Sequence, residues 1–334
     1  MVMPFSRVSN PIQIAGHPLR DHCIVKHDGR WWLTGSEAPF WEGASPGVRL
    51  YVSDDCFHWQ LHATLIDAPA LPADHPCRGR FWAPELHPAH GRWWLTINSG
   101  SESSARRHGI FIWVSDAIDG PYTLVTPQPI GQGFKNDASL FTATDGSSYL
   151  YASGGGLWQA GIDLATGRLI GSNGLTRILG PRDEGLPEWM YGGIEGPCVR
   201  HRAGRYTMLF SAWTRGYEIG WLHAPTPLGP WILGSREPIF GTRKRHYRQR
   251  QAEAGNYVHF AYSDTLDPFA ETGHCSVFDG PDGSDWMCCH YLMQGTHYHY
   301  EGDMLVYEDS EPHLGIEPIH FTADTIKIDG PSWD

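Results

Sequence analysis

One short pattern recurs five times along the 334-residue chain and constrains its fold more than any other feature. A polar-to-small turn that contains glycine is followed at once by a segment rich in aromatic residues, as in HDGRWWLTG and AGRYTMLF. The turn glycines are Gly29, Gly91, Gly146, Gly204 and Gly283. The repeat length is about 60 residues. A regular repeat of a few tens of residues indicates a radial or stacked array of small structural units.

Each repeat is expected to hold four antiparallel strands, with the turn between the first and the second. A third strand is visible at 49–55, 109–117 and 217–225, each followed by a turn into an aromatic residue. The DG and HG dipeptides favour tight hairpins. Five such units predict an all-β fold, a five-bladed β-propeller with four antiparallel strands per blade.

We expect residues 1–334 to form a single propeller domain, because no shift in composition marks a second one. The segment from about 300 to 334 should complete the last blade or close the ring. A long β-sandwich is the alternative all-β fold. Abundant turns and aromatic residues, with 15 Trp and 39 Gly, suit either.

Net charge and cysteine usage exclude several classes of protein. The net charge of −12 argues against a large nucleic-acid interface. Seven cysteines without a CxxC pair fit reduced thiols in a cytoplasmic protein. The first residues lack the pattern of a signal peptide, and no apolar run is long enough to span a membrane. The oligomeric state stays open.

A second regularity accompanies the turns. A few residues before each turn glycine lies one acidic residue or histidine, namely Asp21, Glu85, Asp137, Glu195 and His274. In a propeller the first strands surround the central axis, so these side chains should point into one volume, a convergence that a sandwich leaves unexplained. In blade two the interval is shorter. There we expect Trp82 to be the pocket residue and Glu85 to turn toward structure.

Three converging carboxyl groups predict acid–base chemistry. Taken singly, each is better explained as a turn or cap residue. Together, Asp21, Asp137 and Glu195 would repel one another, which raises at least one pKa. Carboxyl groups whose pKa values are pushed apart are the working parts of a glycosidase. One protonates the leaving oxygen, and another activates water or acts as the nucleophile.

Aromatic residues near these positions suit a carbohydrate, because the apolar faces of sugar rings pack against aromatic side chains. We expect Trp82, Trp213 and Phe40 to bind substrate, whereas most other Trp residues should pack between blades. His274 either completes the ring and holds water or a cation, or is an ordinary core histidine. A lone His has no metal-site spacing, so we expect no transition-metal site.

The same residues resemble glycoside hydrolase family 43 over about residues 15–320. The matching segments are RDHCIV, WAPEL at 82–86, NDASLF, EGP at 195–197 and GHCSVF at 273–278. The resemblance implies a five-bladed propeller that hydrolyses glycosides with inversion. It assigns Asp21 as general base, Glu195 as general acid and Asp137 as the residue that modulates the acid's pKa. It also implies that no cofactor is required and that a structural calcium can lie near His274.

Two departures from the family pattern concern substrate recognition. Asp21 is followed by His22 where the family usually has Pro, so we expect an altered pocket floor. The segment EPHLGIEPI lacks the arginine that many members carry near the end of the last blade. Arg20, or an arginine from 243–250, would take its place. The alternative for this basic run at 242–251 is a solvated loop.

The sequence therefore predicts an exo-acting, inverting glycosidase. Its expected products are L-arabinofuranose or D-xylose, released from plant-derived oligosaccharides. Two alternatives stay open. One is a related glycosidase acting on galactose or anhydro-galactose linkages, since fold and acid placement do not fix the sugar. The other is a non-catalytic propeller that binds carbohydrate or protein.

Overall fold

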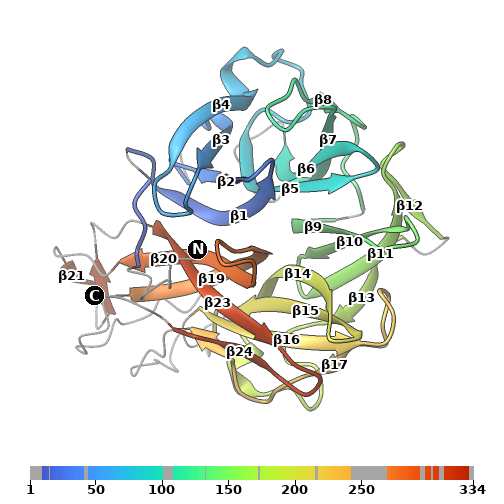
Figure 1. The fold of residues 1–334 in the computed structure, drawn as a ribbon, viewed down its shortest axis with the longest axis vertical. Coiled ribbons are helices and arrows are strands. Elements are labelled where there is room, and N and C mark those ends of the chain that lie inside the picture. The colour runs from blue at the N-terminus through green and yellow to red at the C-terminus, as the bar shows by residue number, and fades with distance from the viewer. Residues whose placement is uncertain are drawn as a thin grey trace.

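A computed structural model shows the chain to be almost entirely β structure. It describes residues 10–14, 16–40, 44–100, 108–131, 133–171, 174–214, 217–241, 269–293, 298–301, 304–307 and 312–330. In this part of the chain, five main sheets each hold four antiparallel strands in chain order around a common centre (Figure 1). The chain is therefore a five-bladed β-propeller, as predicted.

The strands of the blades are as follows. Blade one contains β1 (Leu19–His27), β2 (Arg30–Glu37), β3 (Gly47–Ser53) and β4 (Gln60–Asp67). Blade two contains β5 (Arg80–Ala89), β6 (Arg92–Gly100), β7 (Gly109–Ser115) and β8 (Thr123–Leu124). Blade three contains β9 (Asn136–Thr142), β10 (Ser148–Ser153), β11 (Leu157–Asp163) and β12 (Arg168–Ile170), with β13 (Thr176–Leu179) also paired to β11.

Blade four contains β14 (Ile194–Arg202), β15 (Arg205–Ala212), β16 (Glu218–Ala224) and β17 (Ile232–Leu233), with β18 (Phe240–Gly241) paired to β16. Blade five contains β19 (Phe269–Asp279), β20 (Asp285–Met293), β23 (Pro312–Phe321) and β24 (Ile326–Ile328). A separate hairpin joins β21 (Tyr298–Glu301) and β22 (Met304–Tyr307), and short 3-10 turns occupy Ala68–Ala70 and Glu188–Met190. No described helix has the length and apolarity that a membrane crossing needs.

Paired tryptophans on the second strands show how the blades pack. Neighbouring residues of a strand point to opposite faces of its sheet. Trp31 accordingly joins the core between blades one and five, whereas Trp32 joins the core between blades one and two. Trp93 and Trp94 divide in the same way between the neighbours of blade two. Both faces of these sheets are buried, which explains the consecutive aromatic residues in the repeat.

The repeat glycines form the tight turns that the sequence predicts. Gly29, Gly91 and Gly204 have φ values between +71° and +76°, and the residue before each also has positive φ. Two successive residues with positive φ are the signature of a two-residue type I′ hairpin, whose twist matches that of the flanking strands. These turns fix the register between the first and second strands, and therefore which residues of the two strands face each other.

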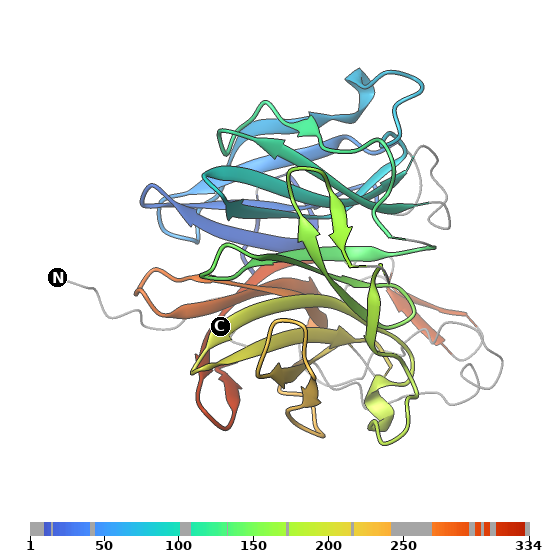
Figure 2. The ribbon, with the colours of Figure 1, turned by 90° about the vertical axis from the view of Figure 1, so that its right-hand side faces the viewer.

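The innermost strands form a closed ring around the axis. β1 contacts β5, β5 contacts β9, β9 contacts β14, β14 contacts β19, and β19 contacts β1. The sheets are seen edge-on in Figure 2. Ile12 exchanges two backbone hydrogen bonds, of 2.7 and 3.2 Å, with Leu314 of β23. The segment before β1 thus joins blade five, and the final strands β23 and β24 complete that blade as expected.

Candidate active site

Each innermost strand carries a β-bulge, where its register with the second strand shifts. The first bulged residue has a left-handed backbone in every blade, with φ of 55° at Asp21, 44° at Ala83, 49° at Asp137, 60° at Gly196 and 50° at His274. We call these five residues the bulge ring. Bulges bend a strand and re-aim side chains next to active sites. Four of the five positions hold a residue other than glycine, which is locally unfavourable and has to be offset by surrounding contacts.

The bulge ring corrects the expected ring of five equivalent polar residues at two positions. Glu195 stands one residue before the bulge, which in blade four falls on Gly196. In blade two the bulge falls on Ala83, and Glu85 lies beyond it, where it pairs with Thr96 in the regular ladder. The Oε2 atom of Glu85 lies 3.3 Å from Nε2 of His87, and both side chains are largely buried. The shorter interval in blade two predicted that Glu85 turns toward structure, whereas the interval did not separate Glu195 from the neighbouring Gly196.

A cavity of about 640 Å³ collects most of the predicted site residues. Its described lining includes Asp21, Asp137, Glu195, His274, Arg20, Trp82 and Trp213. Phe40 is not part of that described lining. Its carbonyl oxygen accepts a 2.9 Å hydrogen bond from the indole N–H of Trp82, so Phe40 contributes by orienting the tryptophan. A cavity of this size is typical of a small-molecule site.

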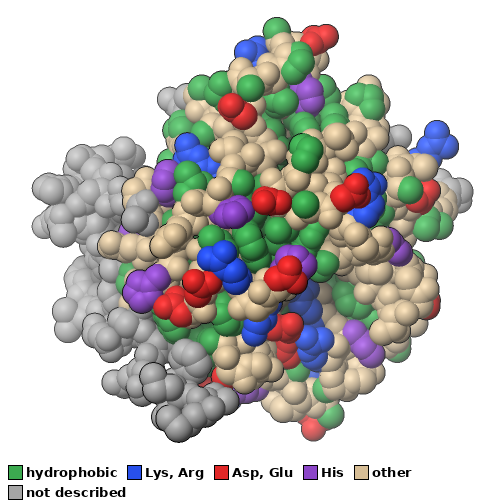
Figure 3. Space-filling view, turned by 45° about the horizontal axis from the view of Figure 1, so that its top comes forward, with side chains coloured by type: hydrophobic (Ala, Val, Ile, Leu, Met, Phe, Trp, Pro, Cys, Tyr) green, Lys and Arg blue, Asp and Glu red, His purple; other side chains and the backbone are tan. Residues whose placement is uncertain are grey.

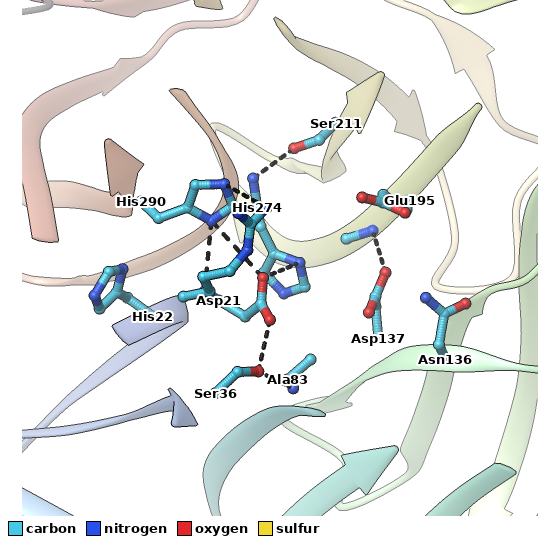
Figure 4. A network of polar contacts seen from close by, with 12 residues as sticks. Asp21, His22, Ser36, Ala83, Asn136, Asp137, Glu195, Ser211, His274 and His290 are labelled. Atoms are coloured by element: carbon cyan, nitrogen blue, oxygen red, sulfur yellow. Dashed lines mark hydrogen bonds and ion pairs between the residues drawn. The ribbon is translucent and has the colours of Figure 1, made fainter. Parts of the chain in front are cut away.

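Asp21 is held as a carboxylate. Its Oδ2 atom accepts a 2.6 Å hydrogen bond from Ser36, and its Oδ1 atom lies 3.4 Å from Nδ1 of His274 (Figure 4). Burial alone would raise the pKa of Asp21, but His274, Arg20 and the Ser36 hydroxyl together lower it below its ordinary value. Asp21 is therefore ionised at neutral pH and able to accept a proton.

Glu195 is held in the opposite state. Burial, followed by the nearby charge of Asp137, raises the pKa of Glu195 to about 7, although a 2.7 Å hydrogen bond from the Tyr217 hydroxyl works against this rise. The pKa of Asp137 is also raised, by burial first and by repulsion from Asp21, despite the attraction of His274. Asp137 accepts hydrogen bonds from Ser153 Oγ at 2.7 Å and from the backbone N–H of Gly196 at 3.3 Å. The cavity thus holds one ionised carboxylate and one carboxyl group that keeps its proton near neutral pH.

His274 and His290 lie beside Asp21 (Figure 4), and Arg20 contacts His290. Burial opposes a charge on His274, but attraction by Asp21 and the other carboxylates raises its pKa. Its Nε2 atom is buried and has no hydrogen-bond partner in the described part of the chain. His290 lies beside Asp21, with its Nε2 3.3 Å from Nη2 of Arg20. Burial and then the charge of Arg20 lower the pKa of His290, so this ring is neutral.

Sequence reasoning missed a second set of polar residues, on the second strands. Each pairs with the residue just before a bulge, and each is buried. We call this set the second-strand ring: Ser36, Asn98, Ser153, Ser211 and His290. Every member lies seven residues after its turn glycine, an interval that could have revealed it in the sequence. Tyr217, which contacts Glu195, has no such regular position.

Most of the second-strand ring holds the bulges in place. Ser36 bonds Asp21 of its own blade and accepts a 2.8 Å hydrogen bond from the backbone N–H of Ala83 in the next. Ser211 accepts one of 2.8 Å from the backbone N–H of His274 (Figure 4). These contacts satisfy backbone groups that the bulge removes from the strand ladder. The second strands therefore position the bulge-ring side chains within the cavity.

Two predictions about recognition can be placed. His22 is not in the described lining of the cavity, so the expected change of pocket floor is corrected. It is buried next to a separate cavity, and burial lowers its pKa to about 3, against the attraction of Asp21. Arg20 does line the main cavity. The basic run at 242–251 lies outside the described residues.

Buried carboxyl groups with opposite pKa shifts, in one cavity on the axis of a five-bladed propeller, define the site of a glycoside hydrolase. The sequence pattern of glycosyl hydrolases family 43 matches residues 8–326. This chain belongs to that family.

Known proteins of related function show the same architecture. A thermostable family-43 glycoside hydrolase of known structure aligns with a TM-score of 0.73 and 22% identity, over 98% of this chain and 97% of that one. An endo-arabinase from Bacteroides thetaiotaomicron aligns with a TM-score of 0.67 and 19% identity, over 95% of this chain and 100% of that one. At these identities the likeness establishes the fold.

A putative beta-xylosidase from Escherichia coli (strain K12) is 30% identical over 146 residues. The match spans 42% of this chain and 26% of that relative, so the matched segment covers about a quarter of the relative's length.

Proposed function

We propose that the protein is an inverting, exo-acting glycosidase that releases L-arabinofuranose or D-xylose from oligosaccharides. The observation that carries the proposal is the split between Asp21, whose pKa is lowered, and Glu195, whose pKa is raised to about 7, in one cavity. Enzymes that cleave glycosidic bonds need one carboxylate and one protonated carboxyl group at the same pH. The names of a xylosidase and an arabinase among the similar proteins support the two sugars.

In the proposed reaction, a water molecule attacks the anomeric carbon on the side opposite the leaving oxygen. Asp21 accepts a proton from this water, and Glu195 donates its proton to the leaving oxygen as the glycosidic bond breaks. The product sugar then has the inverted anomeric configuration. Asp137 keeps Glu195 protonated through its negative charge and supports the site through Ser153 and Gly196.

The test is a panel of aryl glycosides and of xylo- and arabino-oligosaccharides, followed by proton NMR of the first product formed. We expect hydrolysis of a xyloside or an arabinofuranoside, monosaccharide release from one chain end, and inversion. Hydrolysis only of galactosides or anhydro-galactosides would move the substrate to the alternative class. Binding of oligosaccharides without any hydrolysis would contradict the assigned chemistry, and retention of configuration would contradict the role of Asp21 as base.

The calcium ion near His274 is a separate proposal. Calcium prefers six to eight oxygen ligands, and the described residues offer no group of three His, Cys, Asp or Glu side chains placed around an ion. This donor set does not fit direct coordination, so an ion would sit beside His274 through its own water molecules. We expect EDTA to leave the rate of hydrolysis unchanged. A rate that falls with EDTA and returns with calcium would contradict this expectation.

We further propose a cytoplasmic protein that binds neither nucleic acid nor membrane. All seven cysteines are free and buried, which suits a reducing compartment. On the face drawn in Figure 3, acidic, basic and histidine side chains of the described residues are interspersed, with no broad basic patch. Fractionation of the native host and a salt-dependent DNA-binding assay test these two points.

A further inference from the structure

Asn98 differs from the other four members of the second-strand ring. Ser36, Ser153, Ser211 and His290 all contact a bulge-ring residue of their own or the next blade. Neither the Oδ1 nor the Nδ2 atom of Asn98 has a hydrogen-bond partner among the described residues. By its position it would be expected to hold the bulge at Asp137, yet it makes no such contact. Its side chain is therefore not engaged in supporting the bulges.

An unpaired carboxamide at this position is unfavourable for folding. Asn98 is only 1% exposed and lines the main cavity, so the cavity is the side from which a partner can approach it. A carboxamide carries two N–H donors and an oxygen acceptor, and a buried polar group without partners destabilises the folded state. Such groups are rare in folded proteins, and each calls for a partner. The described residues do not provide that partner, which points to a bound molecule.

The surroundings of Asn98 show where that molecule would lie. Asn98 pairs directly with Trp82 across β5 and β6, so the two side chains stand on the same face of the sheet, and both line the main cavity. The Trp82 indole is fixed by its bond to Phe40 and packs at 5.0 Å against the ring of His108. The blade-two side of the cavity thus offers a fixed aromatic ring beside a free carboxamide.

Blade two also lacks the charge that other blades bring to the axis. Its bulge-ring residue is Ala83, whereas blades one and three place Asp21 and Asp137 there. A neutral carboxamide with both donors and an acceptor, next to an apolar ring, is complementary to a sugar with adjacent hydroxyl groups. One hydroxyl can donate to Oδ1 while its neighbour accepts from Nδ2.

We propose that Asn98 binds two neighbouring hydroxyl groups of the sugar in the cavity and is a specificity-determining residue of the enzyme. The proposal rests on the proposed function for the identity of the ligand, since it assumes that the cavity holds the sugar being cleaved. A site built to bond a hydroxyl group strongly rejects analogues that lack it, because its own polar atoms are then left unpaired.

The first test compares wild type with Asn98→Ala on 4-nitrophenyl β-D-xylopyranoside or α-L-arabinofuranoside, whichever is hydrolysed, and on its monodeoxy analogues. We expect kcat/KM of the variant to fall about tenfold or more on the parent glycoside. We also expect the wild type to discriminate against one or two deoxy analogues and the variant to lose that discrimination. Equal discrimination by the two proteins would overturn the proposal.

The second test separates ligand binding from a structural role. In Asn98→Leu the unpaired amide is replaced by an apolar side chain, so we expect a higher Tm together with lost activity. A lower Tm with unchanged kcat/KM would mean that the amide serves the fold. Thr207→Val is the matched control: the Thr207 hydroxyl is also buried on a second strand without a described partner, but it does not line the cavity. We expect the control to keep wild-type kinetics.

Failure of the proposed function can be distinguished from failure of this inference. If the wild type hydrolyses no glycoside, calorimetric titration with D-xylose, L-arabinose and D-galactose still reports on Asn98. Weaker binding of one sugar by Asn98→Ala than by wild type would support the proposal. Equal binding, or no binding of any of the three sugars by the wild type, would overturn it.

Discussion

Blades two and four share one framework and use it for different purposes. Both have a type I′ hairpin, a bulged inner strand and a second-strand residue paired with the position before the bulge. In blade four those positions hold Glu195 and Ser211, and Ser211 is bonded to the next blade. In blade two they hold Trp82 and Asn98, and Asn98 is unbonded among the described residues. In the proposed function, the bulge provides the location, and the residue type decides between proton transfer and sugar recognition.

Removing the acid of blade four should give the largest effect. In Glu195→Gln no proton is available for the leaving oxygen, so we expect hydrolysis of oligosaccharides to fall by about 10²- to 10⁴-fold. Initial rates on the substrate found in the panel measure this loss. Trp213→Phe, in the same blade and at the same cavity, is the comparison variant and should retain far more activity. Full activity in Glu195→Gln would show that blade four does not supply the acid.

The same substitution should stabilise the fold above neutral pH. The raised pKa of Glu195 means that its contribution to stability is present in the protonated state, below its ordinary pKa, and is lost as the pH rises through about 7. Glutamine carries no charge at any pH. We therefore expect the Tm of Glu195→Gln to exceed that of wild type at pH 8 and the difference to shrink toward pH 4. An equal difference in Tm at pH 8 and pH 4 would argue against a buried carboxyl group with a raised pKa.

Removing the charge of Asp137 in blade three tests whether the pKa of Glu195 in blade four depends on it. Asp137 is the largest electrostatic contribution to the raised pKa of Glu195 after burial. In Asp137→Asn the pKa of Glu195 should fall, and the alkaline limb of kcat/KM should move to lower pH. Activity at pH 7 should drop by roughly ten- to a hundredfold. If the alkaline limb of kcat/KM does not move, burial alone accounts for the raised pKa of Glu195.

Tyr217→Phe should shift the same limb in the opposite direction. The Tyr217 hydroxyl donates to Oε1 of Glu195 and favours its ionised form, so its loss should raise the pKa of Glu195. We expect the alkaline limb of kcat/KM to move to higher pH, with less than about a tenfold change at the optimum. The opposite shifts of this variant and of Asp137→Asn exclude a general disturbance of the site. A shift to lower pH would reverse the assigned role of this hydrogen bond.

The smallest effect concerns stability, and it sharpens the contrast between Ser211 and Asn98. Ser211→Ala leaves the backbone N–H of His274 without its acceptor, which should destabilise the fold by about 1–3 kcal/mol. Chemical denaturation measures the free energy of unfolding. An unchanged value in Ser211→Ala would mean that the second-strand ring does not hold the bulges, and the exceptional status of Asn98 would lose its basis.

The features predictable from sequence are those set locally. Turn glycines and paired tryptophans depend on neighbouring residues, so they revealed the strands, the hairpins and the five-fold repeat. Asp21, Asp137 and His274 fell on the bulge ring because their intervals to the turn are nearly constant. All three lie in the cavity with Glu195.

The features that escaped prediction depend on pairing between strands and between blades. The shorter interval in blade two set Glu85 apart in the sequence, but its neighbour His87 is known only from the structure. The roles of Ser36 and Ser211 appear only once the register is known, because their partners lie in the next blade. Tyr217 lies directly before β16, the third strand of blade four, and its hydroxyl bonds Glu195. Its ring packs against Gly273, where a Cβ atom would lie only 2.4 Å from the ring.

The central claim is that Asp21 and Glu195 hold opposite protonation states in one cavity at neutral pH. Carbon-13 NMR titration of the aspartate and glutamate side-chain carboxyl groups, with Asp21→Asn and Glu195→Gln to assign the two resonances, measures this without any substrate. The account predicts that Glu195 titrates at about 7, while the Asp21 carboxyl titrates below the ordinary value for aspartate. Titration of Glu195 near its ordinary value of about 4.3 would contradict the account.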